Sequence, residues 1–545
     1  MADRLGADVV EHLRRGYFPG RSSDIVFVPT PGTTVVRWSG KGLGTDLSDP
    51  RTTHPTPWDY HQRVPIVLYG PGFIRAGKQV QRSVDVTDIE PTFAELMGFD
   101  FDAPDGEPLR EALASTNPKL PEPRESPRVV VLVAYDGGGW NLLEEWPDAW
   151  PFQQQLMDEG TTYLNATIGS APSVTTAIHA NMGTAAYPET HGMPEITARV
   201  PDGSVGDIYL DEADPTLLEV ETIADAWDLE QGNRPWVGMV GYESWHLGMM
   251  SHGGESPDGA DHDMAVLWEP EPSPGEFFTN EEFYELPTYL PGEEVLEEHL
   301  RDLDGQDGAI DDRWMGWDLT DPKVIPGTPA FVEYQGDALL EMIEREPIGE
   351  DEVTDMLFLE LKPTDFGGHL WNMLAPEEEF VLQAQDRVLR DLVEALDRKV
   401  GRDEYVLALT ADHGQTPKPE TVGGFRVHPD LLGRAVDRYF GVKLIQKVTP
   451  SGLFVDRAAA QRAGVSLEAI ARFVGLYRYG DGLPSDADRS LIPPEDLDQE
   501  VFAAALPAAF FEDLSPGEVE AFGESEYGEG NLTRPAVELP GIGLS

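Results

Sequence analysis

Short apolar runs alternate with amphipathic stretches along most of the chain. The apolar runs stand at 24–29, 64–69, 128–134, 236–241, 355–361 and 405–410. Helical periodicity separates several of these runs, most clearly at 376–398. Continuous apolar runs are typical of strands that a parallel sheet buries on both faces, and their alternation with helices indicates an α/β domain. We therefore expect a mostly parallel central sheet flanked by helices.

A stretch rich in proline and charge at 113–127 interrupts this pattern and predicts a linker. It separates an N-terminal segment, 1–112, from a core over 128–430. We expect the core to carry a lid-like insertion near 195–345. The remaining residues, 431–545, are expected to pack on the core as a peripheral helical and irregular extension.

Carboxylate and imidazole side chains follow three of the apolar runs. Asp136 directly follows the third run, Asp365 and His369 follow the fifth, and Asp412 and His413 follow the sixth. Because the carboxyl ends of parallel strands meet at one edge of a sheet, we expect these side chains to converge. Such ligands suit zinc, manganese or iron. Each pair alone is a weak signal, since an Asp-His pair in a loop is commonly solvated and an Asp-x-x-x-His commonly belongs to a capped surface helix.

The composition narrows the range of partners. The chain has 39 basic and 99 acidic side chains and a net charge of −60. Nucleic acid and anionic membranes need basic surfaces, so this charge disfavours both, and a negatively charged substrate would depend on bound cations. The chain has no cysteine, which excludes disulfides and thiolate metal sites. Acidity spread along the whole chain is typical of salt-adapted proteomes, although an acidic mesophilic protein fits as well.

The N-terminal stretch 1–18 has no apolar signal segment. No apolar window is long enough to span a membrane. We therefore expect a soluble, cytoplasmic protein without a membrane partner. Nothing in the pattern indicates an oligomeric state.

The segment 171–193 combines a hydroxyl with a helical signal. Thr175 stands four residues before His179, and a Tyr-Pro-Glu-Thr-His-Gly run from Tyr187 follows a turn of small residues. The preceding Pro-Ser turn predicts a helix that begins near Thr175. A hydroxyl at a helix N-terminus faces unpaired N–H groups and the positive end of the helix dipole, which suits a phosphoryl group. Alternatively, Thr175 caps the helix and has no chemical role.

Taken together, the Thr175 segment and the carboxylate–histidine pairs resemble the alkaline phosphatase superfamily, most closely its type I nucleotide pyrophosphatase/phosphodiesterase branch. That branch reads Thr-x-x-x-His, Thr-Gly and Tyr-Pro-x-x-His-Gly at the same spacing, with Thr184-Ala185 here in place of Thr-Gly. The resemblance implies an alkaline-phosphatase-like fold with cap insertions. It also implies two divalent metal ions, zinc in the first place and manganese or iron as alternatives. It assigns one ion to Asp136, Thr175, Asp412 and His413, and the other to Asp365 and His369.

The family's last histidine ligand lies downstream of the Asp-His pair, in a Thr-His-Gly-Ser-Pro-x-Asp-Tyr segment ahead of a Val-Pro strand. Here the matching segment is THPTPWDY at 53–60, near the N-terminus, and a Val-Pro strand follows it. The resemblance therefore implies a circular permutation in which residues 1–112 supply the usual C-terminal part and His54 the remaining ligand. In one alternative, His54 is a loop histidine, and His428 or a water fills the ligand position. In another, residues 1–112 complete the site of a neighbouring subunit.

The resemblance implies hydrolysis of a small phosphorylated substrate, with Thr175 forming a phosphothreonine at the two-metal site. Diesterases of this branch place an asparagine shortly after the His-Gly, where this chain has Met193-Pro194-Glu195-Ile196. Monoesterases use Arg or Lys on the phosphoryl oxygens, and Lys362 is the nearest candidate. We expect a phosphodiester or nucleotide pyrophosphate as the slightly favoured substrate, with a phosphomonoester as the alternative.

The same fold also serves phosphonate hydrolases, phosphosugar mutases, sulfatases and non-catalytic binding proteins. A sulfatase is disfavoured because the chain has no cysteine and carries Thr175 at the nucleophile position. The other readings stay open as less favoured alternatives.

The stretch 242–263 is rich in His, Asp, Gly and Met. It is consistent with a lid, with a surface loop, or with an extra ion held by His246, His252 and Asp261.

Overall fold

The structure is a computed structural model that describes residues 2–37, 52–114, 126–210, 213–252, 263–269, 275–483, 492–528, 530 and 532. The chain divides into two compact units. The smaller unit is formed by Met1–Glu11, Ser23–Tyr60 and Thr416–Ser545, and the larger by His12–Ser22 and His61–Gln415. Most of the predicted linker, 115–125, lies outside the described residues.

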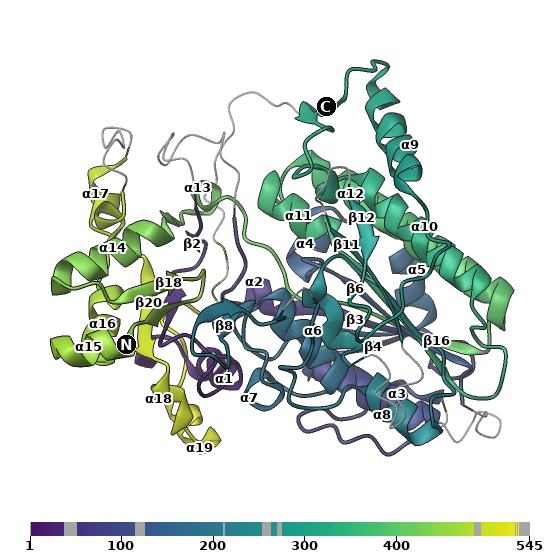
Figure 1. Ribbon diagram of the computed structural model, residues 1–545, viewed down its shortest axis with the longest axis horizontal. Coiled ribbons are helices and arrows are strands. Elements are labelled where there is room, and N and C mark those ends of the chain that lie inside the picture. The colour runs from purple at the N-terminus through teal and green to yellow at the C-terminus, as the bar shows by residue number, and fades with distance from the viewer. Residues whose placement is uncertain are drawn as a thin grey trace. The chain divides into compact units, whose positions relative to one another are not determined.

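A ten-stranded sheet forms the centre of the larger unit (Figure 1). Its strands follow the order β12-β11-β10-β15-β6-β16-β3-β7-β4, with β5 beside β7. From β11 to β16 the strands are parallel, whereas β3 is antiparallel to both of its neighbours. The sheet is thus mostly parallel, as the sequence predicts. The strands are Arg63–Tyr69 (β3), Lys78–Val80 (β4), Val84–Asp85 (β5), Val129–Tyr135 (β6), Thr161–Thr167 (β7), Val237–Val240 (β10), Met264–Glu269 (β11), Glu276–Phe278 (β12), Asp355–Leu361 (β15) and Tyr405–Ala411 (β16).

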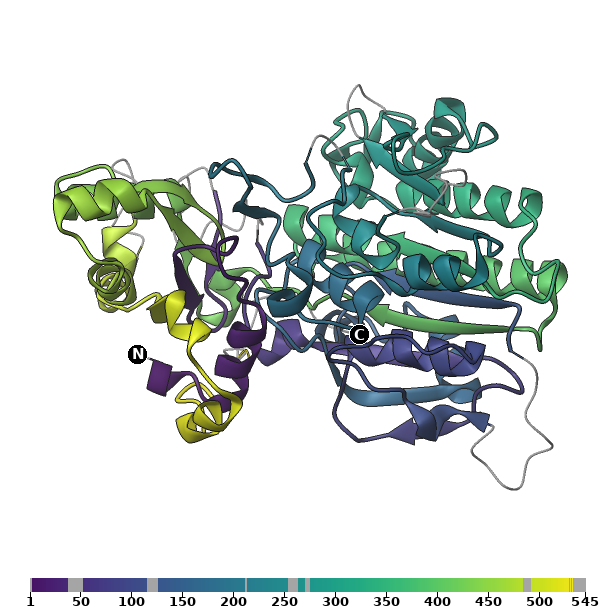
Figure 2. The ribbon, with the colours of Figure 1, turned by 60° about the horizontal axis from the view of Figure 1, so that its bottom comes forward.

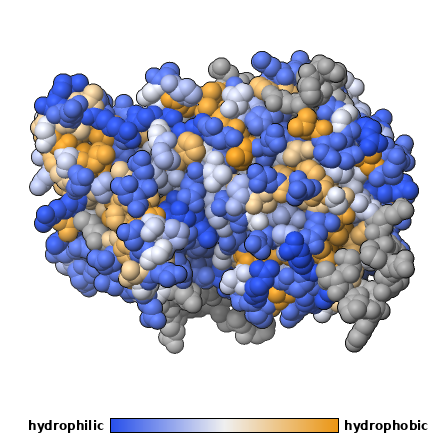
Figure 3. Space-filling model, turned by 90° about the horizontal axis from the view of Figure 1, so that it is seen from below, coloured by the Kyte–Doolittle hydropathy of each residue, from blue (hydrophilic) through white to orange (hydrophobic). Residues whose placement is uncertain are grey.

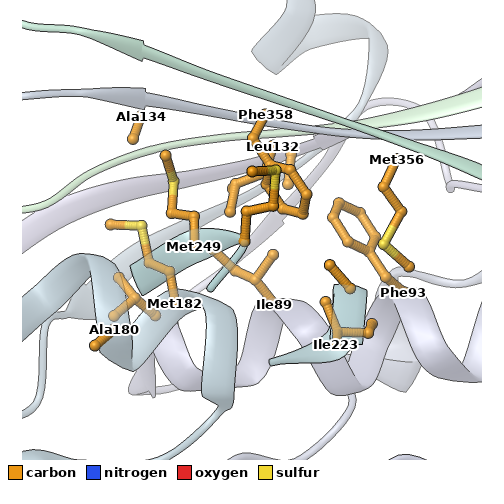
Figure 4. Packing of buried hydrophobic residues seen from close by; sticks show 14 of the residues in the cluster. Ile89, Phe93, Leu132, Ala134, Ala180, Met182, Ile223, Met249, Met356 and Phe358 are labelled. Atoms are coloured by element: carbon orange, nitrogen blue, oxygen red, sulfur yellow. The ribbon is translucent and has the colours of Figure 1, made fainter. Parts of the chain in front are cut away.

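Helices cover both faces of this sheet. Leu132 and Phe358 face a layer that includes Phe93, as Figure 4 shows, whereas Val131 and Leu359 belong to the core on the opposite face. Each fully buried apolar side chain contributes roughly 1.5–3 kcal/mol, so burial on both faces explains why the central strands are apolar throughout. The first layer contains Ile89–Met97 (α3), Thr175–Thr184 (α6) and Ile223–Gln231 (α8), and the second contains Pro151–Glu159 (α5), Pro329–Arg345 (α10) and Pro376–Leu396 (α12). The fold class expected from the sequence, an α/β sheet flanked by helices, is confirmed.

Three neighbouring strands of the sheet end at the same level. Tyr135, the last residue of β6, pairs with Leu361 at the end of β15 and with Ala411 at the end of β16. Strand β6 lies between the other two. The residues that follow these strands are therefore delivered side by side at the carboxyl edge of the sheet.

The smaller unit is built around a four-stranded sheet in the order β18-β19-β1-β20. The N-terminal strand β1 (Ile25–Pro29) pairs antiparallel with β19 (Gly452–Val455) and β20 (Phe502–Pro507), and Figure 2 shows purple and yellow segments side by side there. The fourth strand is Ile445–Val448 (β18), and the helices Pro429–Phe440 (α14), Arg457–Ala463 (α15) and Leu467–Gly475 (α16) contribute to its core. This unit therefore joins residues from both ends of the chain.

Hydrophilic residues dominate the face of the molecule in Figure 3, with smaller hydrophobic areas between them. This agrees with the large excess of acidic side chains. Among the helices of the described residues, none has the length and apolar character that crossing a bilayer requires.

Candidate nucleophile and metal site

Thr175 is the first residue of helix α6. Its N-cap is Val174, whose side chain makes no capping bond, so Thr175 does not serve as the cap. The side chain of Thr175 is buried, and its Oγ1 donates a long hydrogen bond to Asp136 Oδ2 at 3.4 Å. The hydroxyl thus lies at the positive end of a ten-residue helix and beside a strand-end carboxylate.

Helix α6 is fixed by close packing on both sides. Every residue of α6 is buried. A Cβ added to Gly183 would come within 2.2 Å of Gly248 O, so the helix lies directly against the 3-10 helix η5 (Ser244–Met249). Asn181 donates to Ile168 O at 3.1 Å and lies 2.9 Å from His191 Nε2. These contacts hold the nucleophile helix in place.

Asp136, Asp412 and His413 converge at the ends of β6 and β16. Their potential ligand atoms all lie within 4.8 Å of one another. Asp412 Oδ1 accepts a hydrogen bond from Gly137 N at 2.9 Å, which fixes the carboxylate. His413 Nδ1 lies 3.0 Å from Gly414 O and donates to it, which places the lone pair on Nε2, 3.2 Å from Asp412 Oδ2.

Two oxygens of this group show that it fits a cation. Asp136 Oδ1 and Asp412 Oδ2 are fully buried and accept no hydrogen bond. Buried carboxylate oxygens normally have a partner, and two such oxygens next to an imidazole lone pair match the donor set of a divalent metal ion.

Asp365 and His369 lie on helix α11 (Pro363–Leu370), which directly follows β15. His369 Nε2 is 3.3 Å from Asp365 Oδ1, and its side chain is 36% exposed, whereas Asp365 is buried. Lys362 begins this segment, and its ammonium is buried rather than at the surface. Its Nζ lies 2.6 Å from Asp136 Oδ2 and 2.7 Å from Asp365 Oδ2, so it joins the two predicted metal groups.

The electrostatics of the site are dominated by burial and by this lysine. Burial alone would raise the pKa of Asp136, but the Lys362 ammonium and a hydrogen bond from His246 hold it well below its ordinary value. Burial and the charge of Asp136 raise the pKa of Asp412 well above its ordinary value. Burial opposes the charge of Lys362, but the surrounding carboxylates, Asp136 first, raise its pKa well above the usual range.

The structure adds two residues that sequence reasoning did not place at the site. His246, on η5, has its Nε2 3.2 Å from Asp136 Oδ2 and 3.4 Å from Glu360 Oε1. Glu360, the penultimate residue of β15, is fully buried. One sequence signal could have pointed to Glu360: it is a glutamate inside an otherwise apolar strand. A fully buried strand rarely carries a glutamate without a partner.

Two other histidines considered from the sequence, His252 and His428, have partners outside this group of carboxylates. His252 Nδ1 is 3.1 Å from Asp225 Oδ2 on α8, so it does not share a carboxylate with His246, and Asp261 lies outside the described residues. His428 caps α14, where its Nδ1 accepts from Asp430 N at 3.2 Å. His54 belongs to the smaller unit, and its role as a ligand stays a prediction.

Comparison with known proteins identifies the family. The model of the type I phosphodiesterase / nucleotide pyrophosphatase family matches residues 130–432. The chain belongs to this family. The match covers the strands and loops that carry the nucleophile segment and both carboxylate–histidine pairs. This membership agrees with the resemblance to the alkaline phosphatase superfamily that the sequence motifs indicate.

Two curated relatives and one solved structure are also similar to the chain. The chain is 25% identical over 374 residues to a protein named calcium-transporting ATPase from Myroides odoratus, and the match covers 60% of this chain and 65% of the relative. It is 34% identical over 108 residues to alkaline phosphatase PafA of Elizabethkingia meningoseptica, covering 19% of each chain. The crystal structure of wild-type alkaline phosphatase PafA superposes with a TM-score of 0.53 at 18% identity, over 64% of this chain and 76% of that one. The chain thus spans less than two thirds of the length of these two curated relatives, and the superposition shows a shared fold.

Proposed function

We propose that the protein is a metal-dependent phosphohydrolase that cleaves phosphate esters through a phosphothreonine on Thr175. The observation that carries this proposal is the placement of the Thr175 hydroxyl at the N-terminus of α6, 3.4 Å from Asp136. The buried, unbonded oxygens of Asp136 and Asp412 support a bound cation beside that hydroxyl. Family membership supports the reaction class.

The proposed centre holds two divalent ions. Asp136, Thr175, Asp412 and His413 would hold one ion, and Asp365, His369 and His54 the other. When bound, such ions supply positive charge for the attacking and leaving oxygens. Zinc suits these ligands best, and manganese or iron are alternatives.

The circular permutation remains part of this proposal. Strand β3, which follows the His54 segment in the sequence, lies in the central sheet between β16 and β7. Helix α3, also within 1–112, packs on one face of that sheet. Both placements support the view that the N-terminal segment completes the domain that begins at β6.

The proposed reaction has two displacements. Thr175 Oγ1 attacks phosphorus, the bond from phosphorus to the leaving oxygen breaks, and the departing group takes up a proton as an alcohol or phosphate. The Thr175 hydroxyl proton passes to solvent as Oγ1 attacks, and a cation held beside that hydroxyl by Asp136, Asp412 and His413 would favour this by lowering the pKa of the hydroxyl. Water then attacks the phosphothreonine, releases the phosphoryl group and restores the hydroxyl. The backbone N–H groups at the start of α6 are oriented to stabilise the phosphoryl oxygens.

Two substrate classes compete within this proposal. Family membership favours a phosphodiester or nucleotide pyrophosphate. The curated relatives named alkaline phosphatase favour a phosphomonoester as the second candidate. Lys362 was a candidate ligand for monoester oxygens, but its ammonium already contacts two carboxylates, which weakens that role.

The decisive experiment measures hydrolysis of an aryl phosphate monoester and of the matching diester by metal-loaded protein in high salt. Thr175→Val removes the hydroxyl at constant shape, and Thr176→Val makes the same change one residue away at a fully buried hydroxyl without a hydrogen bond. We expect Thr175→Val to lose at least about a thousandfold in rate, because removal of a catalytic nucleophile costs several orders of magnitude. Thr176→Val should keep most activity. Full metal-dependent turnover by Thr175→Val would overturn the assignment, and the faster of the two substrates identifies the class.

A further inference from the structure

A second group of potential ligands shares Asp136 with the first. The ligand atoms of Asp136, His246 and Glu360 all lie within 4.8 Å of one another, and all three side chains are buried. Neither carboxylate oxygen of Glu360 accepts a hydrogen bond. Burial and the negative charge of Asp136 raise the pKa of Glu360 well above its ordinary value. An ionised carboxylate in this position is stable only beside a positive charge.

Lys362 supplies that positive charge. It lies two residues after Glu360 in the sequence. Its Nζ is 2.6 Å from Asp136 Oδ2, the oxygen that His246 also contacts at 3.2 Å. The positive charge of Lys362 also counteracts the rise in the pKa of Glu360. A divalent ion on the same oxygen would stand within a few ångströms of the ammonium, and like charges that close repel strongly inside a protein.

We propose that the Lys362 ammonium takes the place of a divalent ion in the group formed by Asp136, His246 and Glu360. The lysine is then a tethered cation of the centre, and its removal creates a metal site that the native protein lacks. This inference rests on the proposed metal-dependent function, because it concerns the same carboxylates. It goes beyond that function by setting how many ions the centre accepts.

The charge balance supports this role. Four buried carboxylates, those of Asp136, Glu360, Asp365 and Asp412, surround a single lysine that they all stabilise. Removing the lysine leaves these carboxylates with less compensation, and a divalent cation is the most compact replacement.

His246 is arranged to become a ligand once the lysine is gone. Its Nδ1 lies 2.9 Å from Glu243 O, which can accept the Nδ1 proton. In the native protein Nε2 donates to Asp136, and a shift of the proton to Nδ1 would leave the lone pair on Nε2, close to both Asp136 and Glu360. Two carboxylates and one imidazole suit Mn²⁺, which is also easy to count.

The test counts Mn²⁺ ions per folded chain by equilibrium dialysis with elemental analysis, and by the electron paramagnetic resonance signal of bound Mn²⁺. We expect Lys362→Met to bind one ion more than the wild type. Lys362→Arg keeps a cation in place and should keep the wild-type count. The double variant Glu360→Gln/Lys362→Met should also return to the wild-type count, because the new site has lost a carboxylate.

A folded Lys362→Met protein with the wild-type count, or fewer ions, would overturn the inference. Glu360→Gln alone provides a second test that does not depend on the folding of Lys362→Met. It should keep the wild-type count, since the positive charge that acts on Glu360 is that of Lys362, and loss of an ion in this variant would also overturn the inference. Failure of the proposed function is recognised separately, as a wild-type protein that binds no ion at all.

Discussion

The carboxylate of Asp412 accepts a hydrogen bond from the backbone N–H of Gly137 at 2.9 Å. This bond joins the loop after β16 to the loop after β6. Gly137 has φ +70°, and a Cβ there would lie 3.0 Å from both Asp365 Cα and Gln415 Nε2. The loops that carry three of the predicted ligands therefore meet at a residue that only glycine can fill.

Gly137→Ala should therefore destabilise the protein by about 2–4 kcal/mol, combining left-handed strain with crowding. Gly98→Ala is the matched control, because Gly98 has φ +74° with nothing within 4 Å of an added Cβ. Its free energy of unfolding should fall only by the cost of the left-handed strain, about 1–2 kcal/mol. Urea denaturation measures both free energies of unfolding. Equal losses would show that the loops around Gly137 can move apart freely.

His54→Ala should reduce the affinity for one of two bound zinc ions, because the resemblance assigns His54 to the second ion. His428→Ala is the control, since His428 caps α14 through a bond from Asp430 N. It should leave both ions in place and lower the free energy of unfolding by about 1 kcal/mol. Zinc titration by calorimetry distinguishes the two variants. A loss of zinc in His428→Ala alone would assign the ligand position predicted for His54 to His428 instead.

Asn181→Leu should destabilise the protein by about 2–4 kcal/mol and slow turnover. The amide of Asn181 bonds to Ile168 O and Ser170 Oγ and lies against His191, so its loss leaves buried polar groups without partners. Asn165→Leu is the control, because the amide of Asn165 makes an exposed bond to Gln81 O. It should cost less than about 1 kcal/mol. Thermal unfolding and single-turnover rates measure the two effects, and a stable Asn181→Leu protein would refute the role of this network.

Asp355 should introduce a pH dependence into stability. It accepts hydrogen bonds from Trp236 N and Gly349 N, and burial raises its pKa from 3.8 to about 6. Between about pH 4 and pH 6 the native state keeps a proton that the unfolded chain has released. The stabilising contribution is thus complete below about pH 4 and is lost as the pH rises to about 6, a change of up to about 3 kcal/mol.

Asp355→Asn cannot titrate, so it isolates this contribution. The free energy of unfolding of the wild type minus that of the variant should fall between about pH 4 and pH 6 and stay constant above about pH 7. Urea denaturation at a series of pH values gives this difference. A difference that does not change with pH would mean that the native carboxyl titrates at its ordinary value.

The local pattern of the sequence predicted the elements well. The apolar runs match β1, β3, β6, β10, β15 and β16 to within one residue at either end. The predicted helix near Thr175 begins at Thr175 itself. These predictions succeed because strand burial and helix starts leave a signal within a few neighbouring residues.

The burial of Lys362 was harder to anticipate. A lysine after a strand is commonly exposed, and no local pattern distinguishes it from one that contacts carboxylates on two different loops. Its partners Asp136 and Asp365 come together only because β6 and β15 are neighbours that end level with each other.

The strand ends that carry Asp136, Asp365 and Asp412, the helix start at Thr175 and the family resemblance all follow from the amino-acid sequence alone. Spacing along the chain is enough for these, because each depends on a short segment. The position of β6 between β15 and β16, and the contact of His246 with Asp136 across 110 residues of sequence, are visible only in the folded chain. Contacts between distant segments depend on how the sheet and its helical layers pack, and a side chain's identity does not reveal its partner.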